Sequence, residues 1–153
     1  MLSYLYQLRG LENGAYLTGL VFFCAWGCDT CAYVVGMLFG KHKMAPILSP
    51  KKSVEGGIGG IVGSALLGAA YVAVGERIGL VESEQSVVLA FFICCAAGAV
   101  ISQIGDLAAS AIKRNHDIKD YGTLIPGHGG ILDRFDSIIV TAPIIFTLAS
   151  FLL

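Results

Sequence analysis

Charged residues are scarce in this sequence, and that shortage excludes an ordinary soluble domain. Only 14% of its 153 residues are Asp, Glu, Lys or Arg, while 56% are hydrophobic; a soluble domain carries about 25% charged residues. The mean hydropathy is correspondingly high, at +0.76. We therefore expect an all-α fold, a polytopic integral-membrane helical bundle.

Several familiar motifs are absent as well. The sequence has no GxxxxGK[ST] phosphate loop, no dinucleotide-binding fingerprint and no Ser-His-Asp arrangement. The N-terminus lacks the basic region and cleavage site of a signal peptide, so we expect the spans themselves to direct insertion. The five cysteines lie inside apolar runs, and the pair Cys28 and Cys31 has no second Cys/His pair nearby. Small buried side chains are therefore favoured over metal or redox chemistry.

Four apolar segments are long enough to cross a bilayer, which takes about 20 residues of helix. They cover residues 16–39, 58–74, 86–112 and 138–153. The last segment is short, so we expect it to be tilted, shallow or partly buried by its neighbours. Residues 1–15 are too polar and too short to span, and we expect residues 2–11 to lie along the interface as an N-terminal helix.

Basic residues indicate the orientation. Eight of the ten Lys and Arg lie in two connecting loops: Lys41, Lys43, Lys51, Lys52, Lys113, Arg114, Lys119 and Arg134. Basic loops are retained on the cytoplasmic side of a membrane. We therefore expect loops 40–57 and 113–137 to face the cytoplasm, and loop 75–85 and both termini to lie on the other side. The alternation of four spans gives the same orientation.

Asp106 is the first candidate site residue. It stands roughly 30 Å along the third span, if that span is helical, and so at its cytoplasmic end. Ser110 is one helical turn further on, and Lys113 is near the same face. A carboxylate, a hydroxyl and an ammonium in one row suit a metal-bound phosphate. The alternative is an interfacial acid paired with Lys113.

A proline and three glycines lie close together in segment 125–130, IPGHGG. Such a backbone is tight and irregular, and its N–H groups can line an anion site. His128 either orients a phosphate or caps the loop. Asp133 and Asp136 follow at helical spacing. With Asp106 they would form a hard oxygen site, which suits Mg²⁺ with waters and substrate phosphates.

Asp29 interrupts the first span, near Thr30 and Tyr33. A lone carboxylate at that depth is costly and usually faces a polar cavity or a partner. We favour a role in shaping a hydrated pocket over a purely structural hydrogen bond to another helix.

Lys51, Lys52 and Ser53 precede a glycine-rich helix start at Gly56 and Gly57. Free N–H groups at a helix start favour an anion. The alternative for the lysines is ordinary cytoplasmic loop charge. For the glycines further along the second span, close helix packing is favoured over ligand contact.

These features converge on the joining of a charged nucleotide to a lipid phosphate. Phosphoryl-type transfer depends on positioning and charge neutralisation, which divalent ions and Lys or Arg supply. The apolar surroundings suit a lipid substrate.

Three groups of residues form a longer pattern. They are Ser110, Ile112, Lys113, Arg114, Lys119, Asp120, Gly122, Ile125, Pro126, 128–131 and 133–136; Gly105 and Asp106; and Asp29, Thr30, Ala32, Tyr33, Gly36, 39–41, 49–53, Glu55 and Gly56. This pattern resembles that of the phosphatidate cytidylyltransferases (CDP-diacylglycerol synthases) and covers residues 20–150.

The resemblance implies an enzyme of phospholipid biosynthesis that transfers a cytidylyl group from CTP to phosphatidate, giving CDP-diacylglycerol and pyrophosphate. The lipid's own phosphate oxygen would attack, so no covalent enzyme intermediate is needed. Mg²⁺ is the implied cofactor, and the resemblance also allows a second cation, either monovalent or divalent. The implied setting is membrane lipid of the bacterial inner membrane, with the active site at the cytoplasmic face, no nucleic acid partner and room for a homodimer.

Residue by residue, the resemblance also implies roles. The metal-binding acids would be Asp106 and Asp133. The catalytic group would be Asp106, Lys113, Asp133 and Asp136. The substrate-binding residues would be Lys51, Lys52, Ser53, Ser110, Arg114, Lys119, Asp120, His128, Gly129, Gly130 and Arg134.

Family members are usually longer, with more N-terminal spans. We therefore expect residues 1–153 to be a single membrane-embedded catalytic domain, the C-terminal part of a longer architecture. One alternative function is a CTP-dependent lipid kinase of the polyprenol or phytol type, and another is a non-catalytic truncated membrane fragment. A transporter fragment, in which Asp29 and Asp106 bind an ion in transit, is disfavoured because the polar residues gather at one face and not at the midplane.

Overall fold

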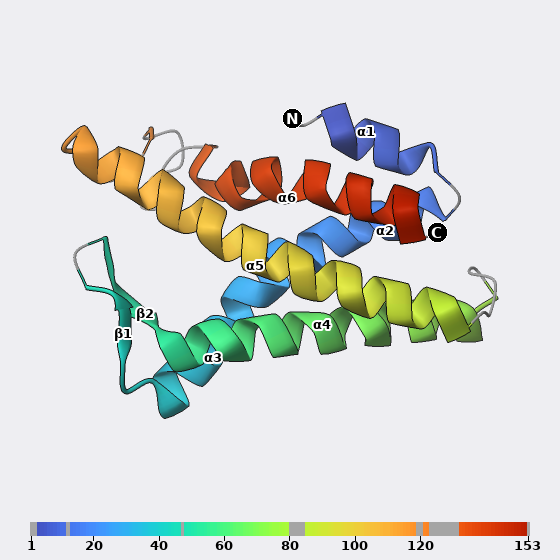
Figure 1. Ribbon diagram of the computed structural model, residues 1–153, viewed down its shortest axis with the longest axis horizontal. Coiled ribbons are helices and arrows are strands. Elements are labelled where there is room, and N and C mark those ends of the chain that lie inside the picture. The colour runs from blue at the N-terminus through green and yellow to red at the C-terminus, as the bar shows by residue number, and fades with distance from the viewer. Residues whose placement is uncertain are drawn as a thin grey trace.

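The computed structural model describes residues 3–11, 13–46, 48–79, 85–118, 121–122 and 132–152. The elements follow in chain order: α1 (Ser3–Arg9), α2 (Gly14–Phe22), the π-helical segment η1 (Phe23–Gly27), α3 (Cys28–Phe39), β1 (Lys43–Ala45), β2 (Ser49–Ser53), α4 (Val54–Arg77), α5 (Gln85–Asn115) and α6 (Leu132–Leu152). Figure 1 shows the helices in an elongated bundle with the β1–β2 hairpin at one end.

Four helical segments of the described chain are long and apolar enough to cross a membrane: Gly14–Phe39, Val54–Arg77, Val87–Asn115 and Phe135–Leu152. They confirm the predicted polytopic bundle, and the protein is an integral, multi-pass membrane protein. The last helix is longer than expected. It begins at Leu132 and has 21 residues, so Asp133 and Asp136 lie in its first turns, as their helical spacing predicts.

Consecutive spans pack on one another, α3 on α4, α4 on α5 and α5 on α6. Figure 1 places the hairpin, the C-terminal end of α5 and the start of α6 at the same end of the bundle, and the end of α4 at the opposite one. The two basic connections, after α3 and after α5, therefore start at the same end of the bundle, as the alternation of spans predicts.

The core forms where α2 and η1 pack against α5 and α6. Its largest buried side chains include Leu17, Leu20, Phe91, Ile138 and Ile145. Leu8 of α1 is fully buried in the same core, and the rings of Tyr4 and Phe146 lie 5.4 Å apart. The N-terminal helix is thus docked on the bundle. All five cysteines are free thiols and four are buried, which confirms their interpretation as small core residues.

A two-stranded hairpin occupies most of the loop expected between the first two spans. Its strands pair antiparallel, with Lys43 opposite Ser53 and a register shift towards the turn. Pro46 and Pro50 conceal the strand signal in the sequence, because proline interrupts the alternating pattern by which short strands are recognised.

The first turn of α4 holds this hairpin in place. The carboxylate of Glu55 accepts hydrogen bonds from the backbone N–H groups of Lys41 and His42, and it lies 2.6 Å from Nδ1 of His42. Ser53 caps the helix, since its hydroxyl oxygen accepts the N–H of Gly56 at 3.1 Å. That N–H group is therefore satisfied by Ser53, and the expectation that it is open to an anion is wrong.

Glycines let α3 and α4 approach closely. A Cβ added at Gly60 would lie 2.9 Å from both the Cys28 carbonyl oxygen and the Ala32 Cβ. One added at Gly56 would lie 2.7 Å from the Ala32 carbonyl oxygen and 3.1 Å from the Cα of Gly36. Small residues serve this purpose in membrane helix pairs, so Gly56 belongs to the packing group as well.

We predict that Gly60→Ala lowers the free energy of unfolding by about 1–3 kcal/mol, because the new methyl group overpacks the crossing of α3 and α4. The matched control is Gly27→Ala, where the nearest atom to an added Cβ, Leu67 Cδ1, lies at an ordinary 3.4 Å. Detergent-induced unfolding followed by circular dichroism measures both variants. Equal stability of the two would contradict the close crossing.

Candidate active site

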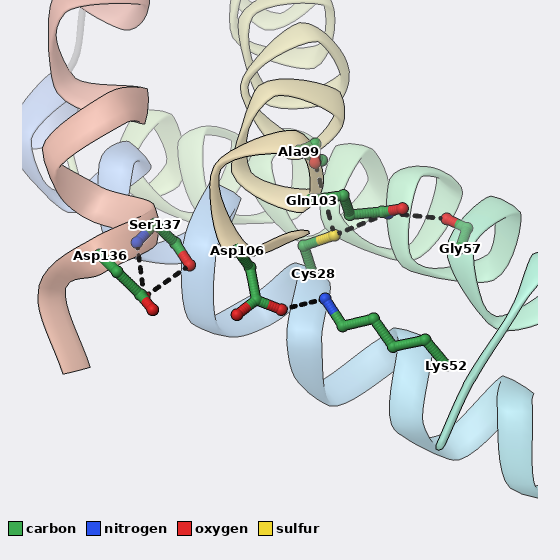
Figure 2. A network of polar contacts seen from close by, with 8 residues as sticks. All are labelled: Cys28, Lys52, Gly57, Ala99, Gln103, Asp106, Asp136 and Ser137. Atoms are coloured by element: carbon green, nitrogen blue, oxygen red, sulfur yellow. Dashed lines mark hydrogen bonds and ion pairs between the residues drawn. The ribbon is translucent and has the colours of Figure 1, made fainter. Parts of the chain in front are cut away.

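Lys52 and Asp106 meet at the hairpin end of the bundle. Lys52 lies on β2 and Asp106 on α5, and the Lys52 ammonium forms an ion pair with Oδ2 of Asp106. Both side chains are about one quarter exposed, at 27% and 25%. Figure 2 shows the lysine reaching across to the helix from its strand. Among the described residues, the ion-pair partner of Asp106 is thus Lys52 and not the Lys113 considered from the sequence.

A cavity of about 560 Å³ opens beside this pair, and we call it the carboxylate cavity. Its lining includes the polar residues Asp29, Ser49, Lys51, Lys52, Ser53, Gln103 and Asp106 and the less polar Tyr33, Met37 and Met44. Tyr33 and Met37 are 70% and 66% exposed. The less polar side of the cavity therefore continues onto the outer surface of a membrane-spanning helix.

Gln103 ties three helices together at this cavity. Its Nε2 donates to the Gly57 carbonyl oxygen at 2.9 Å and to the Cys28 Sγ at 3.3 Å. The Cys28 thiol in turn faces the Ala99 carbonyl oxygen at 3.8 Å. Figure 2 shows this chain of contacts above the ion pair in that view. It fixes the position of α5, and therefore of Asp106, relative to α3 and α4.

Two further carboxylates interact electrostatically with Asp106. Asp29, from α3, lines the carboxylate cavity and interacts electrostatically with Lys52 and Asp106. Asp136, near the start of α6, interacts electrostatically with Asp106, and its Oδ1 accepts the N–H of Ser137 at 2.7 Å. Of the acids predicted from the third and fourth spans, the structure thus places Asp106 and Asp136 near each other, and it adds Asp29 from the first.

A second cavity, of about 330 Å³, lies between the hairpin and the end of α5, and we call it the basic cavity. It is lined by Leu48, Ser49, Pro50, Lys51, Ser110, Lys113 and Arg114. Three cations and two hydroxyls suit an anion such as phosphate. The Lys113 ammonium also lies 5.2 Å from the centre of the Tyr121 ring. Because Ser49 and Lys51 line both cavities, the two adjoin.

Most of the described candidates therefore surround these two cavities. The side chains of Asp133 and Arg134 lie outside the described part of the chain, although their backbone belongs to the first turn of α6. The remaining candidates also lie outside the described residues: Lys119, Asp120, His128, Gly129 and Gly130. Their assigned roles stay predictions.

The motif pattern and the geometry agree with a comparison to known families. The sequence model of the cytidylyltransferase family matches residues 2–152. This chain belongs to the cytidylyltransferase family.

Three curated relatives of this cytidylyltransferase-family chain are named phosphatidate cytidylyltransferase. The Bacillus subtilis protein is 38% identical over 147 residues, which cover 95% of this chain and 52% of the relative. The Staphylococcus saprophyticus protein is 37% identical over 143 residues, covering 93% and 51%. The Haemophilus influenzae protein is 40% identical over 131 residues, covering 86% and 44%. The chain thus spans about half the length of the curated relatives it matches.

Magnesium, the cofactor that the family resemblance implies, suits the oxygen donors present. Among the described side chains, no three His, Cys, Asp or Glu lie close enough to hold a metal ion by themselves. Mg²⁺ does not need three, because it is usually held by one or two carboxylates together with waters and substrate phosphates. Asp106 and Asp136, on the packed helices α5 and α6, provide such donors. One Asp106 oxygen is at present paired with Lys52.

Gln103 is the site residue that the sequence analysis missed. A signal was available, because an amide three residues before Asp106 falls on the same face of an otherwise apolar helix. The pairing of Lys52 with Asp106 had no such signal, since 54 residues separate the two.

We predict that Gln103→Leu lowers the free energy of unfolding by about 0.5–1.5 kcal/mol, the usual range for a hydrogen bond between membrane helices. The change removes both donors that link α5 to α3 and α4. Gln7→Leu, on the exposed surface of α1, is the matched control and should unfold like the parent protein. The same detergent titration measures both. A Gln103→Leu variant as stable as the control would contradict the stabilising role of these two hydrogen bonds.

Proposed function

We propose that this chain carries the site that transfers a cytidylyl group from CTP to phosphatidate, forming CDP-diacylglycerol and pyrophosphate for phospholipid synthesis. One observation supports this most directly: a carboxylate cavity and a basic cavity adjoin at one end of a transmembrane bundle, with Lys51 lining both. A reaction between a lipid and a nucleotide needs two neighbouring binding sites of this kind. The names of the curated relatives support the same reaction.

The carboxylate cavity suits the lipid. Its exposed Tyr33 and Met37 offer apolar surface for acyl chains on a membrane-spanning helix, while Lys52 offers an ammonium to a substrate phosphate. A phosphatidate molecule could therefore enter from the bilayer without removing its chains from an apolar environment.

The basic cavity suits the triphosphate of the nucleotide. Lys51, Lys113 and Arg114 supply three positive charges there, and Ser110 supplies a hydroxyl donor. Charge-assisted hydrogen bonds to phosphate are about twice as strong as neutral ones. Such a lining favours a polyphosphate over a neutral ligand.

In the proposed reaction an oxygen of the lipid phosphate attacks the α-phosphorus of CTP. A new P–O bond forms, the bond from the α-phosphorus to the oxygen bridging it to the β-phosphorus breaks, and pyrophosphate leaves with that electron pair. The cations of both cavities neutralise charge on the reacting phosphates and hold them in line. Lys51, which lines both cavities, is suited to bridge them.

The metal belongs to this proposal as well. Asp106 and Asp136, together with Asp133, would hold Mg²⁺, which when bound neutralises negative charge on phosphate oxygens. A second cation and a homodimer stay predictions from the family resemblance.

We further propose that the site faces the cytoplasm of a bacterial inner membrane, since the lysines of the hairpin and the cations at the end of α5 lie at one end of the bundle. We predict that an impermeant maleimide labels Lys43→Cys from the cytoplasmic side and Ile78→Cys, in the exposed turn after α4, from the other. Inside-out and right-side-out vesicles separate the two sides, and the unsubstituted chain gives the background. The reverse pattern would overturn the orientation.

We predict that Asp106→Asn lowers turnover of CTP and phosphatidate by about 100-fold or more, the usual cost of removing a group that stabilises transition-state charge. The matched control is Asp117→Asn. Asp117 is exposed beyond the end of α5 and has φ 53°, a conformation that Asn tolerates, so this variant should keep its turnover. Labelled CTP, Mg²⁺ and phosphatidate with the membrane-embedded chain provide the assay, and circular dichroism checks folding.

The products of that assay separate the alternatives. CDP-diacylglycerol with pyrophosphate supports the proposed reaction. CDP with a phosphorylated alcohol, when such an acceptor is supplied, would indicate a lipid kinase instead. A folded chain without turnover would indicate a non-catalytic fragment, and full turnover by Asp106→Asn would reject the role of that carboxylate.

A further inference from the structure

The ion pair of Lys52 and Asp106 has a consequence beyond substrate binding. Lys52 is one of the residues assigned to phosphate, yet its ammonium is paired with Oδ2 of Asp106. Asp106 is one of the acids assigned to the metal. A cation of the protein itself thus occupies an oxygen that a metal ion would use (Figure 2).

The surroundings explain why the ammonium lies there. Asp29 and Asp106 both act electrostatically on Lys52, and Asp106 is only one quarter exposed. A carboxylate at such a position in a membrane protein is costly unless a cation accompanies it. Lys52 supplies that cation.

A divalent cation and the ammonium cannot share this position, because like charges at contact distance repel strongly in a partly buried site. The Lys52 ammonium has a second position available. Lys52 lines the carboxylate cavity, which adjoins the basic cavity at Ser49 and Lys51, and the four-carbon stem of a lysine lets its ammonium move while the backbone stays in place. The backbone is fixed, since Glu55 and Ser53 hold the hairpin to α4.

We propose that Lys52 is a built-in counter-ion that competes with the metal for Asp106 and is drawn away by substrate phosphates, so that metal and nucleotide bind cooperatively. This inference rests on the proposed function, since it takes Asp106 as a metal ligand. Metal alone then binds weakly, because it must displace the lysine. Nucleotide phosphates accept the ammonium and free the carboxylate, and by thermodynamic linkage the metal strengthens nucleotide binding by the same factor.

The test measures Mn²⁺ binding to the purified, membrane-embedded chain without nucleotide, by electron paramagnetic resonance of free Mn²⁺. We expect Lys52→Met to bind Mn²⁺ about fivefold or more tightly than the parent protein, at the lower end of usual coupling factors. Lys52→Arg keeps the positive charge and should bind like the parent. The control for loss of one hairpin charge is Lys43→Met, because Lys43 is exposed and lies opposite Ser53 in the same hairpin; its affinity should stay within about twofold of the parent's, as for an exposed charge screened by salt.

Asp106→Asn separates this inference from the function on which it rests. If that variant binds Mn²⁺ as the parent does, the metal assignment itself falls. If it loses Mn²⁺ while Lys52→Met binds no better than Lys43→Met, only the counter-ion proposal falls. Folded variants that all fail to bind Mn²⁺, Lys52→Met included, would also overturn it. Lys52→Gln provides a second charge-removing variant should the methionine variant not fold.

Equilibrium dialysis of labelled CTP tests the nucleotide half of the proposal. The ratio of CTP affinities with saturating Mg²⁺ and with a chelator should fall in Lys52→Met, by up to the factor that this variant gains for Mn²⁺ alone. An unchanged ratio would show that phosphates do not draw Lys52 from Asp106.

Discussion

The ion pair between Lys52 and Asp106 is the interaction on which the site depends. It joins a strand that precedes α4 to the C-terminal part of α5, and it places one positive charge among acids that would otherwise be costly within a membrane protein. The pair forms only because both the strand and α5 are held in position. Glu55 and Ser53 hold the strand to the start of α4, and Gln103 holds α5 to α3 and α4.

The two cavities give the pair its chemical setting. One combines carboxylates with apolar surface on a membrane-spanning helix, and the other contains only cations, hydroxyls and small apolar groups in its described lining. A lipid phosphate and a nucleotide triphosphate differ in the same way, because one is tethered to acyl chains and the other carries most of its charge on phosphate. In the proposed reaction the two substrates would meet beside Lys51, which lines both cavities. The close packing of α3 on α4 at Gly60 holds the helix that carries Asp29 next to them.

The sequence allowed the spans, the shared end of both basic regions and the position of Asp106 at that end to be predicted, because apolar length, charge bias and helical spacing are local properties. The hairpin could not be predicted, since two prolines mask its short strands. The partner of Asp106 could not be predicted either. Lys52 lies 54 residues away, and the contact depends on how closely glycine lets two helices approach, which spacing along the chain does not reveal.

We propose that Asp106 of α5 and Asp136 of α6 hold one divalent cation beside the hairpin. Crystals of the protein with Mn²⁺ and CTP, measured at a wavelength where manganese scatters anomalously, test this most directly. The account predicts an anomalous peak within ligand distance of an Asp106 oxygen, between α5 and α6, with the Lys52 ammonium moved towards the phosphates. A peak elsewhere, or Asp106 and Asp136 directed to opposite sides of the bundle, would contradict it.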